Sequence, residues 1–293
     1  MGRIDDKSMR INTFSFCLLG FASGLPYMLV FATLSTWLAV IDINIATIGF
    51  FSWVSLTYSL KFLWAPLIDR FSIPFLNKLG KRKSWIFFSQ SLIILFLFLL
   101  ANTNPINDLG FFAFYAFLVA LIGSFQDIAI DALRIELVDI KNQGDLAASY
   151  QLGYRIAILL ATSGALLLAS RIEWSYVYQI MAIAMILGIL GCILIKEQIN
   201  SKLRRLNFVN SIYEPIKDFT SRFGIFLASL LLLIISTYRV TDIVTGQITN
   251  VFYIKLGFSL EEIALIVKSI ALAGSIFGFF VGGFLIKKFD LNR

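Results

Sequence analysis

Residues Phe14–Val40 read FSFCLLGFASGLPYMLVFATLSTWLAV and contain no charged side chain. A helix of about 20 apolar residues crosses the hydrocarbon core of a bilayer, so this stretch predicts a transmembrane helix. It is too long for the apolar core of a signal peptide and has no small-residue cleavage motif after it. We therefore expect a retained first span.

Seven further apolar runs follow along the 293 residues, and none shows the alternation of a strand. They cover roughly Ile48–Ile68, Trp85–Asn102, Phe111–Ile135, Leu146–Ser170, Tyr176–Ile195, Phe223–Val244 and Ile263–Ile286. Hydrophobic residues make up 58% of the chain and charged residues 15%, with a mean hydropathy of +0.83. This composition excludes a soluble domain, a disordered chain, a coiled coil and a disulfide scaffold. The prediction is an all-α membrane protein with eight spans.

Lysine and arginine are distributed unevenly between the connecting segments. Of the 25 basic residues, 18 lie in the two terminal segments and in alternate loops, and only Arg171 and Lys255 lie on the other side. Because basic loops remain in the cytoplasm, both termini are expected there. No basic stretch forms a soluble domain of its own, so we expect the lipid bilayer as a partner and no nucleic acid.

The chain divides into a six-helix half at 1–195, a basic cytoplasmic linker at 196–222, and two helices of an incomplete second half at 223–293.

Histidine is absent, which excludes histidine zinc sites and Ser-His triads, and both cysteines lie in apolar runs. We expect no cofactor and no metal. Small residues at four-residue spacing, such as Gly153 and Ala157, are read as helix-packing faces, and Pro26 predicts a bend in the first span.

The fourth span carries ionisable residues that lipid does not tolerate. Asp127, Asp131 and Arg134 are spaced four and three apart, so they share one helical face, and Gln126 lies about 100° away from Asp127. A charge at the bilayer centre costs about 2.5–3.5 kcal/mol or more, so this face must point into the bundle. We interpret Asp131 and Arg134 as a structural pair near the cytoplasmic edge. Asp127 and Arg155 fall at matching depth on consecutive helices, which predicts that they pair or share a cavity.

Two more sets of charges lie within the expected spans. Arg239 and Asp242 are three apart near the outer end of the seventh span, and Lys268 reaches a similar depth in the eighth. They predict a second polar cluster near the outer side. Lys61 lies two turns from the cytoplasmic end of its span, where its ammonium can reach the interface, so we favour an ordinary anchoring role over a functional one.

Five motifs together resemble the AmpG-type muropeptide permeases of the major facilitator superfamily, to which the acetyl-CoA transporters are related. They are GFASGLP at Gly20–Pro26, TIGFFSWVSLTYSLKFLWAPLIDRF at Thr47–Phe71, QDIAIDALR at Gln126–Arg134, LGYR at Leu152–Arg155 and YRVTD at Tyr238–Asp242. Asp69 and Arg70 match part of the superfamily's gating motif, which here is interrupted by an insertion before Gly80.

The resemblance implies proton-coupled import of anhydro-muropeptides, released by cell-wall turnover, across the bacterial inner membrane. Asp127 is then the candidate proton carrier, and Arg155 binds anionic substrate groups or acts as its counter-ion. Arg239 and Asp242 are expected to form an outer gate or to contact the substrate.

The family has at least twelve spans, so we expect a chain shortened at its C-terminus. Three alternatives stay open: a separately encoded remainder, an inactive remnant or subunit, and a carrier of another anionic solute such as acetyl-CoA. An intramembrane enzyme is not expected, since Asp127 and Asp131 share one helix whereas aspartyl proteases place their two aspartates on different helices.

Overall fold

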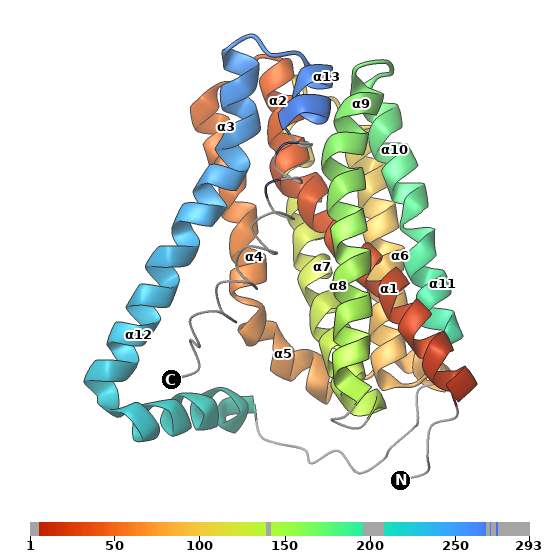
Figure 1. Cartoon of the computed structure of the whole chain (residues 1–293), viewed down its shortest axis with the longest axis vertical. Helices are drawn as coiled ribbons and strands as arrows, with labels where there is room; N and C mark the ends of the chain where they lie inside the picture. The colour runs from red at the N-terminus through yellow and green to blue at the C-terminus, as the bar shows by residue number, and fades with distance from the viewer. Residues whose placement is uncertain (1–5, 139–141, 196–207, 268–269, 271–273, 275–293) are drawn as a thin grey trace.

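The computed structural model describes residues 6–138, 142–195, 208–267, 270 and 274, and every regular element in these ranges is a helix. Figure 1 shows a bundle of long, roughly parallel helices with α12 crossing beside it. Among the residues that the structure describes, six stretches are long and apolar enough to cross a membrane. They are Met9–Val40, Lys81–Ala101, Leu109–Leu137, Gln143–Ala169, Trp174–Leu194 and Lys217–Ile235. The prediction of an all-α membrane protein is confirmed.

The first span is a continuous helix with a π-helical turn in its middle. It is formed by α1 (Asp6–Met28), the π turn η1 (Leu29–Thr33) and α2 (Leu34–Val40). Pro26 lies three residues before the π turn, where it removes one backbone donor from the helix. This π turn is a locally widened stretch of helix that follows Pro26, and the bend itself stays a prediction.

The expected second span is not one helix. It is divided into α3 (Ile45–Phe51), the 3₁₀ turn η2 (Ser52–Ser55), α4 (Leu56–Ser59) and α5 (Lys61–Arg70). The α-helix is interrupted at Leu60, which has φ −91° and ψ 12°. The prediction of a continuous helix here is wrong, and the break places Lys61 at the first position of a new helix.

The next four spans follow the predicted order closely. After the 3₁₀ turn η3 (Pro74–Leu79) come α6 (Lys81–Ala101) and α7 (Leu109–Leu137). The fifth span consists of α8 (Gln143–Leu159), the π turn η5 (Leu160–Gly164) and α9 (Ala165–Ala169). The sixth consists of α10 (Trp174–Ala184) and α11 (Ile186–Leu194).

The later part of the chain holds α12 (Phe208–Lys255), α13 (Leu260–Glu262) and the π turn η6 (Ile263–Val267). Gly224 interrupts α12 with φ 72° and ψ 156°. Figure 1 shows α12 as a segment across the lower end that turns into a long ascending helix. The kink lies beside the expected linker boundary at 222, and the division into two halves stays a prediction. Most of the expected eighth span lies outside the described residues.

The helices α1 and α8 pack against each other through glycine. A Cβ atom added at Gly20 would lie 2.0 Å from the Tyr150 carbonyl oxygen, and one added at Gly153 would lie 1.8 Å from the Cys17 carbonyl oxygen. Only glycine allows two backbones to approach this closely. This contact fixes the position of Ser23 relative to Tyr150.

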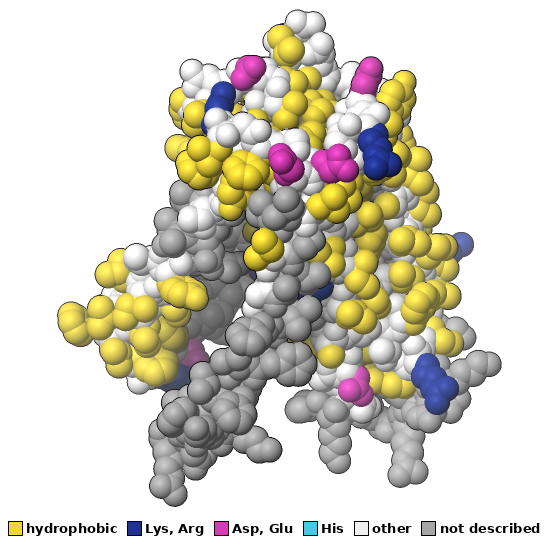
Figure 2. Space-filling model, turned by 45° about the horizontal axis from the view of Figure 1, so that its top comes forward, with side chains coloured by type: hydrophobic (Ala, Val, Ile, Leu, Met, Phe, Trp, Pro, Cys, Tyr) yellow, Lys and Arg dark blue, Asp and Glu magenta, His cyan; other side chains and the backbone are white. Residues whose placement is uncertain are grey.

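The surface agrees with a membrane environment. Figure 2 shows hydrophobic side chains covering the flank of the molecule, while most charged side chains in this view lie toward its two ends. Large apolar side chains such as Phe114, Ile183 and Ile193 are more than half exposed on the flank. Lipid, rather than water, can surround such a surface.

Candidate functional site

The carboxylate of Asp127 lies at a contact between three helices. The hydroxyl of Ser23 on α1 donates a hydrogen bond to Asp127 Oδ1 on α7. The hydroxyl of Tyr150 on α8 donates in turn to Ser23 Oγ at 2.8 Å. The chain Tyr150–Ser23–Asp127 therefore orients the Asp127 carboxylate and links α7 to α1 and α8.

A pocket of about 350 Å³ opens beside this carboxylate. Three tyrosines, two serines, one lysine and one aspartate line it: Tyr27, Tyr58, Tyr154, Ser55, Ser59, Lys61 and Asp127. The rings of Tyr27 and Tyr58 pack edge to face with centroids 5.1 Å apart. Hydroxyls, aromatic faces, a cation and an acid suit a polar ligand that carries both ring and charged groups.

Gly123 makes room for the side chain of Tyr58, one of the residues that line the pocket. A Cβ atom at Gly123 would lie 2.2 Å from the Tyr58 hydroxyl. That hydroxyl is buried and has no hydrogen-bond partner among the residues that the structure describes. A buried hydroxyl without a partner is costly, so Tyr58 is a candidate ligand contact in the pocket.

Asp131 lies one turn along α7 from Asp127, as predicted. Arg134 Nη2 is 3.3 Å from Asp131 Oδ1, and Lys61 Nζ is 3.9 Å from Asp131 Oδ2. The structure therefore pairs Asp131 with Arg134, and the structural role of this pair stays a prediction. It also places Lys61 on the wall of the Asp127 pocket, where a solely interfacial anchoring role does not account for it.

The structure does not bring Arg155 to Asp127. Arg155 is exposed, and no ion pair to it occurs in the described part of the chain. Gly153 and Ala157 are the α8 residues buried against α1, and Arg155 lies two positions from each, about 200° around the helix. The sequence spacing did not predict the direction of the Arg155 side chain.

Gln126 faces a different neighbour from Asp127. Its Nε2 donates to the Ala22 carbonyl oxygen at 3.0 Å, and the side chain is fully buried between α7 and α1. The predicted rotation of about 100° thus separates it from the pocket. In this structure Gln126 holds two helices together and does not line the Asp127 pocket.

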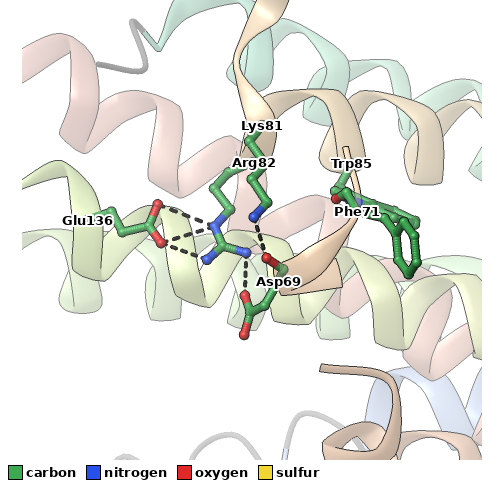
Figure 3. A network of polar contacts seen from close by, with 6 residues as sticks. All are labelled: Asp69, Phe71, Lys81, Arg82, Trp85 and Glu136. Carbon is green, nitrogen blue, oxygen red and sulfur yellow. Dashed lines mark hydrogen bonds and ion pairs between the residues drawn. The ribbon is translucent and has the colours of Figure 1, made fainter. Parts of the chain in front are cut away.

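A second network of charges lies at the end of α5, α6 and α7 (Figure 3). Arg82 Nη1 is 2.6 Å from Asp69 Oδ1, and Arg82 Nη2 is 2.7 Å from Glu136 Oε1. The Arg82 side chain is only 6% exposed, so these two carboxylates compensate a buried cation. Asp69 and Arg70 were both predicted as motif residues. Asp69 belongs to this network, whereas Arg70 is exposed and lies outside it.

The connection between α5 and α6 is shaped to allow this pairing. Gly80 precedes α6 with φ 99°, a conformation that favours glycine. Lys81 donates to the Asp69 carbonyl oxygen, and Trp85 Nε1 donates to the Phe71 carbonyl oxygen at 2.8 Å. The insertion in the motif is therefore folded back, so that Asp69 meets Arg82 across it.

The predicted outer cluster is only partly within the described structure. Arg239 and Asp242 lie on α12, but their side chains fall outside the described part, and Lys268 lies outside the described residues. Their grouping stays a prediction.

Sequence reasoning missed Ser23, Tyr58, Tyr150 and Tyr154. A signal was present, because Tyr150 and Tyr154 are four apart on α8 and flank Gly153, the residue that faces α1. Polar residues next to a close-packed glycine row lie at the helix contact and can reach across it.

Comparisons with known proteins agree with this architecture. The family model of the Major Facilitator Superfamily matches residues 16–293. A protein named AmpG 4 from Rickettsia conorii is 36% identical over 280 residues, which cover 93% of this chain and 67% of that protein. The anhydromuropeptide permease of Escherichia coli K12 is 34% identical over 278 residues, 94% of this chain and 55% of the permease. The chain thus spans just over half the length of the latter. Its helices, its matched motifs and these similarities show that it belongs to the major facilitator superfamily.

Proposed function

We propose that this chain takes part in proton-coupled import of anhydro-muropeptides across the inner membrane, with Asp127 as the proton carrier. Two kinds of observation support it: similarity to a permease named for that substrate, and an aspartate that faces a pocket within a membrane-spanning helix. The orientation we propose has both termini in the cytoplasm, on the side of the basic loops.

The observation that carries the proposal is the bonding of Asp127. Among the described residues, no cation lies within ion-pair distance of this carboxylate, and its hydrogen bond comes from the neutral hydroxyl of Ser23. An ionised carboxylate within a membrane is costly without a partner, and proton binding removes that cost. Asp127 is therefore suited to exchange a proton as the pocket opens to water.

The substrate assignment rests on the pocket as well as on similarity. A muropeptide joins sugar rings to a peptide with carboxylate groups. The tyrosine rings of the pocket can stack on sugar rings, its serine hydroxyls can bind sugar hydroxyls, and Lys61 can bind a carboxylate. In alternating access, one half of the transporter moves against the other around such a central site.

Complementation tests the proposal in cells. A bacterial strain that lacks its muropeptide importer should regain uptake of labelled anhydro-muropeptide when this chain is expressed. Asp127→Asn should abolish that gain, because a side-chain amide neither binds nor releases a proton near neutral pH. The matched control is Asp108→Asn, which changes an aspartate at the outer start of α7 and should leave uptake intact. Equal uptake by Asp127→Asn and the parent chain would rule out the proton-carrier role.

A further inference from the structure

Lys61 occupies an unusual position for a membrane lysine. It is the first residue of α5, directly after the break at Leu60, and its side chain is 47% exposed on the pocket wall. A cation at a helix N-terminus is unfavourable by about 0.3–1 kcal/mol, because the helix dipole is positive there. The ammonium is therefore better placed away from the helix end, toward the carboxylates of α7.

Two carboxylates are within its range. Lys61 Nζ lies 3.9 Å from Asp131 Oδ2, which is beyond a hydrogen bond, and Asp131 already has Arg134 at 3.3 Å. Asp127 lines the same pocket as Lys61 and lies one turn away from Asp131, about 6 Å along α7. A four-carbon lysine side chain can span that distance by changing rotamers.

We infer that Lys61 is an exchanging counter-ion, paired with Asp131 while Asp127 is protonated and moving to Asp127 when the proton leaves. This inference rests on the proposed proton-carrier role of Asp127. Arg134 remains on Asp131 during the exchange, so neither carboxylate is left without a cation. Lys61 thereby takes the counter-ion role that the sequence had suggested for Arg155.

The exchange also gives the pocket a specificity for anions. When Asp127 is protonated, the ion-pair partner of Lys61 among the described residues is Asp131 at 3.9 Å, so a carboxylate of a ligand can bind the ammonium. When Asp127 loses its proton, it competes with the ligand for Lys61. Proton release and ligand release are then coupled through one cation.

Several polar groups surround Asp127 and share its electrostatic environment. They are Ser23 and Tyr27 on α1, Ser55 on η2, Tyr58 and Ser59 on α4, Lys61 on α5, Asp131 and Arg134 on α7, and Tyr150 and Tyr154 on α8. Of these groups, Lys61 is the cation that lines the same pocket as Asp127. Its removal should therefore change the titration of Asp127 more than removal of a distant lysine.

Infrared difference spectroscopy on the full chain in lipid tests this without measuring transport. The carboxylic-acid band of Asp127 is identified by its loss in Asp127→Asn, and its intensity is followed with pH. In Lys61→Gln the midpoint should move to higher pH by about 1–3 units, the usual effect of losing a nearby cation. Lys61→Arg should keep the midpoint near that of the parent, which also shows that the position tolerates substitution. Lys255→Gln, which removes a lysine paired with Asp42, is the matched control and should change nothing.

A double substitution separates exchange from simple charge effects. Asp131→Asn should lower the midpoint in the parent chain, because it releases Lys61 to Asp127. In the Lys61→Gln background the same substitution should have a smaller effect. Equal effects in both backgrounds, or no change of the midpoint in Lys61→Gln, would contradict the exchange while leaving the proton-carrier role standing. A parent band with no pH dependence would instead contradict the role of Asp127 itself.

Discussion

Arg82 shows how a single side chain can organise one end of the bundle. Its guanidinium is shared by Asp69 at the end of α5 and Glu136 at the end of α7, while its own backbone belongs to α6. A planar guanidinium can donate to two carboxylates at once, which a lysine cannot do in the same geometry. Three helix ends therefore depend on this residue.

Substitution Arg82→Gln should destabilise the chain by about 1.5–3 kcal/mol, because it removes charge-assisted hydrogen bonds to two carboxylates. The measurement is the apparent Tm in detergent. Arg70→Gln, which removes an exposed arginine from the same segment, is the control. Equal Tm values for the two variants would show that the Arg82 network has no stabilising role.

At this scale the sequence predicts contacts within a helix better than contacts between helices. The pairing of Asp131 with Arg134 follows from a spacing of three. The contact between Asp69 and Arg82 depends on how residues 71–80 fold back, and the contact between Ser23 and Tyr150 depends on the close approach of α1 and α8. No helical period encodes either of these.

Among the elements, the break between α4 and α5 is the largest departure from the predicted spans. Pro66 lacks the backbone donor that would bond to the carbonyl four residues earlier, which weakens a helix through this segment. Trp64 Nε1 lies 3.4 Å from the Thr57 carbonyl oxygen near the break and donates to it. Apolar composition predicted a membrane segment here, but a mean hydropathy taken over about 20 residues cannot locate a helix interruption of one residue.

The contact between α1 and α8 depends on glycine, which gives a second prediction. Gly153→Ala should destabilise the chain by about 1–3 kcal/mol, the usual cost of overpacking, because the new methyl group would meet the Cys17 carbonyl. Gly246→Ala is the control, since nothing lies within 4 Å of a Cβ atom there. Apparent Tm values measure both, and a fully stable Gly153→Ala would contradict the observed helix contact.

The start of α13 depends on pH through a capping box. Glu262 accepts hydrogen bonds from the backbone N–H and the hydroxyl of Ser259, and these bonds lower the pKa of Glu262. A carboxyl group with a lowered pKa stabilises the folded state above its ordinary pKa, and this contribution is lost as the pH falls through the lowered value. The protection factors of the amides at residues 260–262, corrected for the intrinsic exchange rate at each pH, should therefore fall in acid. Glu262→Gln should remove this pH dependence, and an unchanged acid response in that variant would exclude Glu262 as its source.

For the whole molecule, the contact between α12 and α2 joins the later part of the chain to the first span. Asn250 Nδ2 donates to Thr36 Oγ1 at 3.0 Å in a buried position, and Lys255 Nζ lies 3.4 Å from Asp42 Oδ1. Figure 1 shows α12 beside α2 at the upper end. If the two parts move against each other during transport, this contact must open.

A disulfide between Thr36→Cys and Asn250→Cys should therefore stop uptake, and reduction should restore it. The double variant is made with Cys17→Ser and Cys192→Ala, so that no native thiol competes. Each single cysteine variant is a control for the effect of substitution alone. Full uptake by the cross-linked chain would mean that this contact stays closed throughout transport.

The membrane class and the order of the spans were predictable at this scale, because lipid requires long apolar helices and composition reports them. The family was recognisable from motifs such as the one at Gln126–Arg134. The direction of the Arg155 side chain and the position of Lys61 were not predictable from the sequence. Both depend on how whole helices rotate and break where they pack against their neighbours.

The central claim is that protons drive substrate movement through Asp127. Its most direct test is uptake of labelled anhydro-muropeptide by proteoliposomes that contain the full chain, with and without an imposed pH gradient. We expect accumulation that requires the gradient, is abolished by a protonophore and is absent in Asp127→Asn. Accumulation that is independent of the gradient, or that persists in Asp127→Asn, would contradict this account.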